Sequence, residues 1–167
     1  NMNMKKMKTI VASLLIVLAT LGLDQWTKWA IERSISLNDS VEMIKHFFYL
    51  TYVQNTGAGF SMFAGAGMGF FALLTIVALA AILYMFFKTE DSRYQICLSL
   101  VFSGAIGNFI DRMTLGYVRD FFSFYIFGYP FPVFNVADIC ITIGIALILV
   151  SMFIDDKKEQ ERWKQES

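Results

Sequence analysis

Four long apolar segments limit what this sequence can fold into more than any other feature. They cover approximately residues 10–30, 67–87, 94–114 and 134–154. Each is about 20 residues long, and a helix of that length crosses a hydrocarbon core of roughly 30 Å. Of the 167 residues, 56% are hydrophobic and 17% are charged, whereas about a quarter of the residues in a soluble domain are charged. We therefore expect an all-α polytopic membrane protein with four transmembrane helices, folded as a single domain over residues 1–167.

Basic residues at the ends of these segments predict the topology. Lysines precede the first segment as they do in a signal peptide, but this apolar run is too long for one and three more spans follow it. We expect it to be a retained helix. Nine of the fourteen basic residues flank one side of the predicted bundle: Lys5, Lys6, Lys8, Lys88, Arg93, Lys157, Lys158, Arg162 and Lys164. Because such residues prefer the cytoplasm, both termini should be cytoplasmic and the connections 31–66 and 115–133 should face outward.

Charge and rare residues exclude several classes of function. Fourteen basic residues balance fourteen acidic ones, so no basic surface for nucleic acid is expected. Two cysteines and one histidine form neither a disulfide framework nor a structural zinc site. Cys97 is expected near the inner end of the third helix and Cys140 near the outer end of the fourth, so they are too far apart for a disulfide. His46 is interpreted as an interfacial side chain. We expect no metal and no other cofactor, so any catalysis must use other side chains.

The two outward connections are richer in aromatic residues than ordinary loops. Residues 46–53 are aromatic and β-branched, which predicts a strand, and the turn-like residues 55–57 follow it. Eight aromatic residues fall within positions 121–134. Two interpretations remain open: an aromatic belt at the membrane interface, or connections that fold onto the bilayer surface and receive something partly lipidic.

Seven polar or charged residues interrupt three of the spans. A charge in a span costs at least about 2.5 kcal/mol, so these residues call for an explanation. On the predicted topology all seven lie in the outer part of the membrane, which predicts a single interior site. Gly104 and Gly107 extend the polar face of the third segment and would let neighbouring helices approach closely. The seven are Asp24, Lys28, Asn108, Asp111, Arg112, Asn135 and Asp138.

Spacing alone explains some of these residues as ion pairs. Asp24 and Lys28 are four residues apart and can form an ion pair along one helix. Asp111 and the adjacent Arg112 are also predicted to form an ion pair. Asp138 has no basic residue within a turn or two on its own segment. It must therefore be protonated, partnered from another helix, or used in chemistry.

Two carboxylates that share one proton form the aspartic-protease arrangement, in which one acts as base and the other as acid. From the residues alone, either Asp111 or Asp120 is a possible partner for Asp138. The main rival is a small proton- or ion-coupled transporter, since buried acids also form proton relays. A relay needs polar residues toward both faces, however, and the inner halves of the four spans are almost wholly apolar.

Five short motifs resemble those of one family, in the same order along the chain. The sequence resembles the bacterial lipoprotein signal peptidases (signal peptidase II). Gly59 and Ser103 depart from the residues most common in the family, and both are small. The matching segments are 24–28, 54–61, 104–112, 118–121 and 134–138.

The resemblance implies an aspartic endopeptidase of the bacterial cytoplasmic membrane, with its active site near the outer face. Such an enzyme removes the signal peptide from diacylglyceryl-modified prolipoproteins, cleaving before the lipidated lipobox cysteine. The family pattern places the catalytic pair at Asp120 and Asp138. It also implies membrane lipid as a partner and inhibition by cyclic peptide antibiotics such as globomycin.

The resemblance also assigns supporting residues and outer structure. Asp24 and Lys28 would hold the first outer connection, which in the family includes a small sheet cradle and an interfacial helix. The remaining site-supporting positions are Asn55, Gly57, Gly104, Asn108, Asp111, Arg112 and Asn135.

Overall fold

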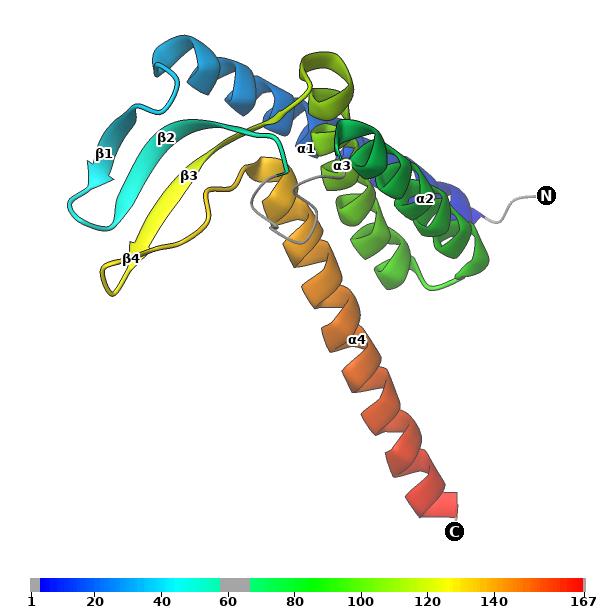
Figure 1. The fold of residues 1–167 in the computed structure, drawn as a ribbon. Helices are drawn as coiled ribbons and strands as arrows, with labels where there is room; N and C mark the ends of the chain where they lie inside the picture. Colours follow the sequence, from blue (N-terminus) through cyan, green and yellow to red (C-terminus); the bar gives the residue numbers. More distant parts are fainter. Residues whose placement is uncertain (1–3, 58–66, 167) are drawn as a thin grey trace.

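Four long helices form the frame of the molecule. The computed structural model describes residues 4–57 and 67–166, and its helices are α1 (Met4–Ser34), α2 (Gly67–Lys88), α3 (Ser92–Leu115) and α4 (Val136–Glu166) (Figure 1). All four are long and apolar enough to cross a membrane. The four predicted spans are thus confirmed, and α1 and α4 continue past their predicted ends into charged sequence.

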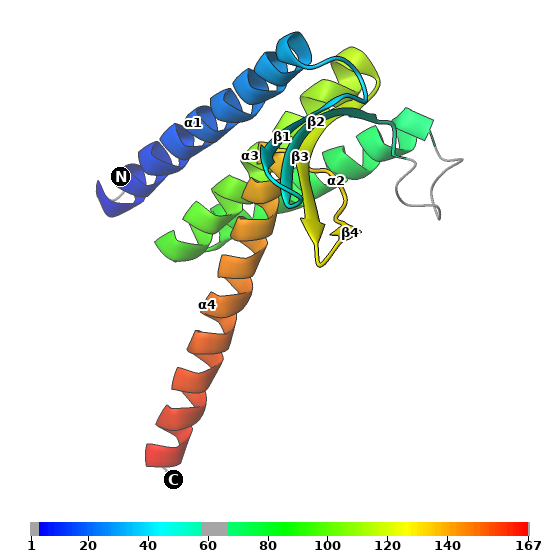
Figure 2. The same ribbon diagram turned by 90° about the vertical axis from the view of Figure 1, so that its left-hand side faces the viewer.

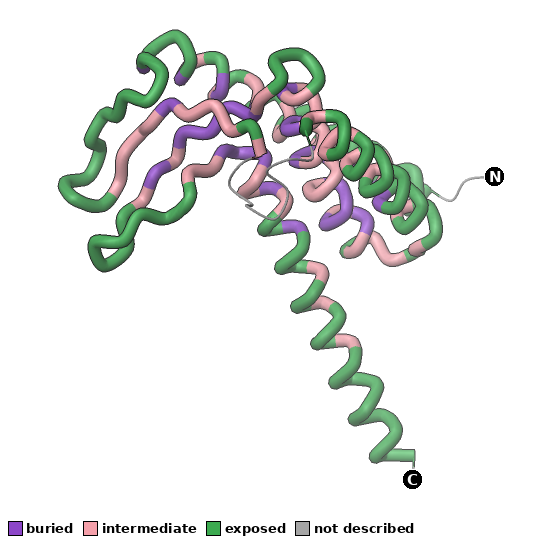
Figure 3. The backbone as a smooth tube through the Cα atoms, in the orientation of Figure 1, coloured by how far each residue is buried: buried purple, intermediate pink, exposed green. Residues whose placement is uncertain are grey.

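The helix surfaces are those of a membrane protein. Most of α2 and the distal part of α4 are exposed along their length, as Figure 3 shows for α4. Exposed residues there include Leu73, Val77, Leu147 and Val150. Contiguous apolar surface of this extent is unfavourable in water and is expected where lipid is the solvent.

The helix α3 is central and packs against the other three helices. Small residues allow the close approach. A Cβ at Gly104 would overlap the backbone carbonyl oxygen of Ala137 on α4, and a Cβ at Gly107 would overlap the carboxylate of Asp24 on α1. The predicted close-packing face of the third helix is therefore present and brings α1, α3 and α4 together at one level.

Both outward connections contribute to one antiparallel sheet. Its strands are β1 (Ser40–Ile44), β2 (Phe48–Asn55), β3 (Val118–Ile126) and β4 (Tyr129–Pro130), in the order β1-β2-β3-β4 (Figure 2). The predicted strand at 46–53 is confirmed as β2, although His46 lies in the preceding turn. Residues 35–57 contain no helix, and positions 58–66, where the rest of this connection lies, are outside the described residues.

The start of α4 differs from the prediction. The fourth span was expected from residue 134, but α4 begins at Val136. Phe134 instead pairs with Phe122 of β3 through backbone hydrogen bonds, so Asn135 is left at the junction of sheet and helix. Beneath the sheet, a small apolar core joins α1, β2, β3 and α4. It consists of Ile31, Ile35, Tyr52, Phe121, Val136 and Cys140.

Candidate active site

Two carboxylates from different elements are hydrogen-bonded to the same residue, Asn135. Asp120 lies on β3 and Asp138 on the first turn of α4. The side-chain nitrogen of Asn135 donates to Oδ1 of Asp120 at 2.7 Å, and the backbone N–H of Asn135 donates to Oδ2 of Asp138 at 3.1 Å. Asn135 therefore fixes both carboxylates relative to one another.

The local sequence explains how Asn135 comes to do this. Its side-chain oxygen accepts the backbone N–H of Asp138 at 3.0 Å, while Asp138 accepts the N–H of Asn135 in return. This reciprocal pair is a capping box, in which a residue at the N-cap and one three positions later satisfy each other's free N–H groups. The start of α4 thus holds the carboxylate of Asp138 at the helix N-terminus, where the helix dipole favours negative charge.

Asp120 lies in a drier setting than Asp138. Only 3% of Asp120 is exposed, and Oδ2 accepts a hydrogen bond from the side-chain nitrogen of Asn55 at 3.1 Å. Burial, and after it the negative charge of Asp138, raise the pKa of Asp120 to about 7, against the opposing effect of its amide donors. Asp138 is only half-buried. The two acids therefore meet in unequal surroundings, which is how acid and base roles become separated.

Asn108 on α3 connects this pair to a buried cation. Its side-chain nitrogen donates to Oδ1 of Asp138 at 2.9 Å, and its oxygen accepts from Nζ of Lys28 at 3.0 Å and from Asn135 at 3.1 Å. With its oxygen toward the ammonium, the amide presents its nitrogen to Asp138. Lys28 thus acts on the carboxylate through Asn108.

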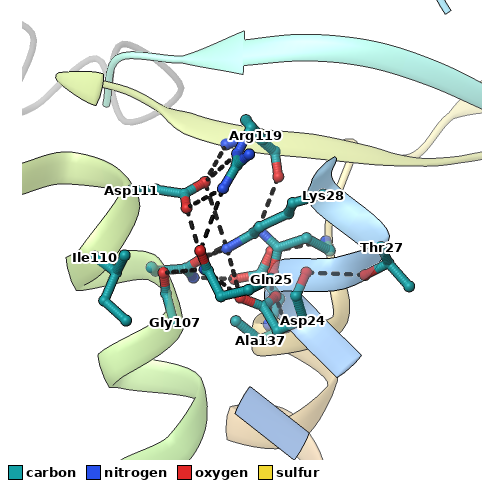
Figure 4. Close-up of polar contacts among 12 residues, drawn as sticks. Asp24, Gln25, Thr27, Lys28, Gly107, Ile110, Asp111, Arg119 and Ala137 are labelled. Atoms are coloured by element: carbon teal, nitrogen blue, oxygen red, sulfur yellow. Dashed lines mark hydrogen bonds and ion pairs between the residues drawn. The ribbon is translucent and has the colours of Figure 1, made fainter. Parts of the chain in front are cut away.

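A second buried cluster lies beside the first, and it contains the predicted Asp24–Lys28 pair (Figure 4). Lys28 is fully buried, and Nζ lies 2.9 Å from Oδ2 of Asp24 and 3.6 Å from Oδ2 of Asp111. The other oxygen of Asp24 accepts the backbone N–H of Ala137 at 2.8 Å. This bond ties α1 to the first turn of α4, so Asp24 braces the helix that carries Asp138.

The predicted pairing of Asp111 with Arg112 is wrong. Adjacent residues on a helix point about 100° apart, and Asp111 instead pairs with Arg119 of β3 through Nε at 3.1 Å and Nη2 at 2.9 Å. Arg112 lies over the ring of Phe71 at 5.6 Å and near enough to Asp138 for their charges to interact.

Arg119 is a residue that the sequence analysis missed. Its guanidinium also contacts Glu32 at 3.0 Å and Gln25 at 3.3 Å, and its carbonyl oxygen accepts from Asn135 at 3.3 Å. The sequence did indicate a role for Arg119, because an arginine within an apolar segment needs hydrogen-bonding or charged partners when it is buried. Gln25, a polar residue next to Asp24 in the first span, could have been identified by the same reasoning.

The two remaining predicted residues act through the backbone. Gly57 has a left-handed φ of 88°, its N–H donates to Oδ1 of Asn55 at 2.8 Å, and a Cβ there would collide with the ring of Phe71. It therefore orients the amide that contacts Asp120. Gly104 serves the packing of α3 on α4. In the motif 54–61, positions 58–61 lie outside the described residues.

A groove opens beside Asp138. It has a volume of about 270 Å³, its surface is almost wholly apolar, and it lies between α4 and the residues that follow β4. Its lining residues are Phe131, Phe134, Asp138, Ile139, Thr142 and Ile143. Within residues 4–57 and 67–166, no three His, Cys, Asp or Glu side chains are arranged to hold a metal ion.

Comparison with known proteins identifies the family. The family model for signal peptidase (SPase) II matches residues 16–154. The chain belongs to the signal peptidase II family. Lipoprotein signal peptidases of Staphylococcus aureus strains JH9 and Newman are each 43% identical over 164 residues, covering 95% of this chain and 99% of each relative.

Solved structures agree with the signal peptidase II assignment. A bacterial membrane enzyme determined by the in meso method at 1.9 Å resolution is 42% identical, with a TM-score of 0.79 over 86% of this chain and 93% of that one. A second, at 2.3 Å, is 41% identical, with a TM-score of 0.82 over 89% and 92%. The protein is therefore an integral membrane enzyme of the peptidase class, and nothing in the comparisons favours the transporter.

Proposed function

We propose that the protein removes signal peptides from diacylglyceryl-modified prolipoproteins by cleaving before the lipidated cysteine, and that Asp120 and Asp138 are its catalytic pair. The observation that carries the proposal is that Asn135 binds both carboxylates at once, Asp120 through its side-chain nitrogen and Asp138 through its backbone N–H. Prolipoprotein as substrate follows from the lipoprotein signal peptidases that the chain resembles.

The alternative partner, Asp111, is already neutralised. Its two oxygens accept from Arg119, and Lys28 lies 3.6 Å away. A carboxylate held by two cations loses its basicity toward water. This supports Asp120 over Asp111 as the partner of Asp138.

The unequal environments of the two acids indicate their roles. Asp138 is half-buried at the start of α4, accepts N–H groups from Asn108 and Asn135, and lies near Arg112. Asp120 is buried, and burial raises its pKa to about 7. At neutral pH we therefore assign the shared proton to Asp120 and the role of general base to Asp138.

The reaction then balances with one water and one shared proton. Asp138 takes a proton from water as the water oxygen attacks the scissile carbonyl carbon, and Asp120 gives its proton to the carbonyl oxygen. When the resulting diol collapses, the C–N bond breaks. The leaving nitrogen receives the proton from Asp138, and Asp120 recovers one from a diol hydroxyl, so both acids return to their starting states.

The placement of the site supports the proposed topology. Asp120 and Asp138 lie where α3 ends and α4 begins, at the opposite end of the bundle from the α2–α3 link that carries Lys88 and Arg93. With the basic side cytoplasmic, the active site is near the outer face and both termini are inside. Helices and sheet together build one site, so residues 1–167 act as one membrane-embedded peptidase domain.

The apolar groove beside Asp138 supports a lipidic substrate. Its walls are aromatic and aliphatic, and the groove reaches the exposed side of α4 near Ile143. An acyl chain or the apolar part of a signal peptide fits such a surface. We extend the proposal to membrane lipid as a partner and to cyclic peptide antibiotics such as globomycin as competitors for the site.

The test uses purified full-length protein in detergent and a synthetic lipobox peptide with and without the diacylglyceryl group. We expect cleavage on the amino side of the lipidated cysteine, inhibition by globomycin, and little turnover of the unmodified peptide. Equal turnover of both peptides would refute the lipid requirement, and no cleavage of the lipidated peptide would refute the proposed activity.

A further inference from the structure

The tip of the β3–β4 hairpin has an unexpected composition. Ile126 pairs with Tyr129, so the turn consists of Phe127 and Gly128, with φ of 49° and 80°. Two positive φ values define the type I′ turn, where Asn-Gly is preferred and a bulky residue at the first position is strained. Phe127 is nevertheless 96% exposed. Burial of the ring within the described residues therefore does not offset this strain, and the ring is free to contact something outside the chain.

The surroundings of Phe127 extend the apolar character. No charged residue lies between Asp120 and Asp138, and Ile126 and Tyr129 are 46% and 78% exposed. The other hairpin tip differs, since Lys45 and His46 are exposed there and the backbone N–H of His46 donates to Glu42. One end of the same sheet therefore carries a charged tip and an uncharged aromatic tip.

The two tips also lie at different heights. In Figures 1 and 2 the β3–β4 tip is lower than the β1–β2 tip, displaced in the direction in which α4 runs. That direction leads toward the part of α4 that exposes Ile143 and Leu147 to lipid. The aromatic tip is thus on the membrane side of the sheet.

A second protein strand is a poor occupant for this edge. The strand β4 has only two residues, and Pro130 and Pro132 lack the N–H group that strand addition needs. Aromatic side chains at the level where helices leave the hydrocarbon are, in contrast, well suited to the acyl-glycerol boundary of a bilayer.

We propose that the β3–β4 tip, residues 126–129, inserts into the bilayer and anchors the sheet at a fixed depth. The anchor affects catalysis because β3 runs from Asp120 directly to the tip. The tip begins six residues after Asp120, which corresponds to roughly 20 Å of extended strand. Inserting the tip would set the height of Asp120 above the membrane. The proposal needs only the membrane location, so it can fail while the catalytic assignment stands.

The first test measures depth by fluorescence. Trp26, Trp29 and Trp163, all exposed, are replaced by Phe, and a single Trp is then introduced as Phe127→Trp or His46→Trp. These positions are matched, since each has a positive φ at a hairpin tip (49° and 58°). The proteins are reconstituted without substrate in phosphatidylcholine–phosphatidylglycerol vesicles containing lipids brominated on the acyl chains.

We expect brominated lipid to quench Phe127→Trp and aqueous iodide to quench His46→Trp. Iodide quenching of both, with no effect of brominated lipid on Phe127→Trp, would overturn the proposal. So would quenching of Phe127→Trp that appears only when a brominated lipopeptide substrate is added to unbrominated vesicles, because the tip would then bind substrate rather than the bilayer.

The second test separates anchoring from folding. Phe127→Asn suits the left-handed turn and removes the aromatic ring, while Phe127→Leu keeps an apolar side chain. In vesicles we expect Phe127→Asn to raise KM for the lipidated peptide several-fold with kcat kept and with no loss of Tm in detergent, and Phe127→Leu to stay nearer the parent. An unchanged KM in Phe127→Asn would show that the tip does not set the depth of the site.

Discussion

At the scale of single residues, Asn135 performs two tasks with one amide. Its oxygen caps α4 by accepting the N–H of Asp138, and its nitrogen donates to Asp120. The first bond stabilises the helix, whereas the second orients a carboxylate that helix stability does not require. Substitutions that separate these bonds therefore separate folding from chemistry.

Asn135→Ser should keep the cap and lose the bond to Asp120, because serine is as good an N-cap as asparagine but has no nitrogen donor. We expect cleavage to be strongly reduced and Tm to fall modestly, because Asn108 and the Arg119 carbonyl also lose the donor nitrogen. Asn135→Ala, the matched control, loses the cap as well and should cost a further 0.5–2 kcal/mol or so of stability. Parental activity in purified Asn135→Ser would contradict the role given to the amide.

The raised pKa of Asp120 predicts how stability depends on pH. The folded state disfavours ionised Asp120, whose pKa rises to about 7 from an ordinary value of 3.8. The contribution of Asp120 to the free energy of unfolding is therefore greatest below about pH 4. This contribution is lost as the pH rises through about 7. Asp120→Asn should show a smaller fall in Tm between pH 5 and pH 8 than the parent in the same detergent. Parallel curves for the two proteins would refute the raised pKa.

At the scale of elements, the site depends on the meeting of β3 with α1 and α3. Four spans and one strand were predictable, since apolar length and β-branched content are local properties of the sequence. The strand β3 was not identified as one, because its register is set by pairing with β2 across about sixty intervening residues. Residue spacing alone did not decide whether Asp120 or Asp111 is the partner of Asp138. It also predicted Arg112, instead of Arg119, as the ion-pair partner of Asp111. Both questions depend on the pairing of β3 with β2.

A double-mutant cycle tests the corrected ion pair. Asp111→Asn and Arg119→Gln should each destabilise the protein by a few kcal/mol, because each leaves a charge buried without its partner. Together they should cost less than the sum, giving a coupling of about 0.5–3 kcal/mol. The matched cycle of Asp111→Asn with Arg112→Gln should show little coupling. The opposite ranking of the two cycles in thermal or chemical unfolding would restore the pairing expected from adjacency.

At the scale of the whole molecule, the helices supply a membrane frame and the sheet supplies the other half of the site. Asp138 comes from a helix start and Asp120 from a strand, so neither part contains the pair by itself. The apolar surfaces of α2 and α4 fix the protein in lipid, and the buried polar residues collect at one end. Under the proposed function, this arrangement would give the site access to water while a lipid-anchored substrate stays in the bilayer.

The proposed orientation is testable by labelling in intact cells. Ser36→Cys lies in the first outer connection and Glu159→Cys at the end of α4, and both positions are exposed. The native Cys97 and Cys140 are buried, so background labelling should be low. An impermeant maleimide added from outside should modify Ser36→Cys and reach Glu159→Cys only after lysis. Labelling of both without lysis would overturn the topology.

The measurement that tests the central claim most directly is turnover of a lipidated lipobox peptide by purified Asp120→Asn, Asp138→Asn and the double variant. Asp155→Asn serves as the matched control, because it makes the same change in an exposed ion pair with Arg93 at the other end of the bundle. We predict that each single variant loses turnover while keeping its fold and its binding of globomycin. The double variant should be hardly worse than either, since the two acids act as one unit, and Asp155→Asn should cleave like the parent. Appreciable cleavage by Asp138→Asn, free of contaminating peptidase, would contradict the shared-proton mechanism.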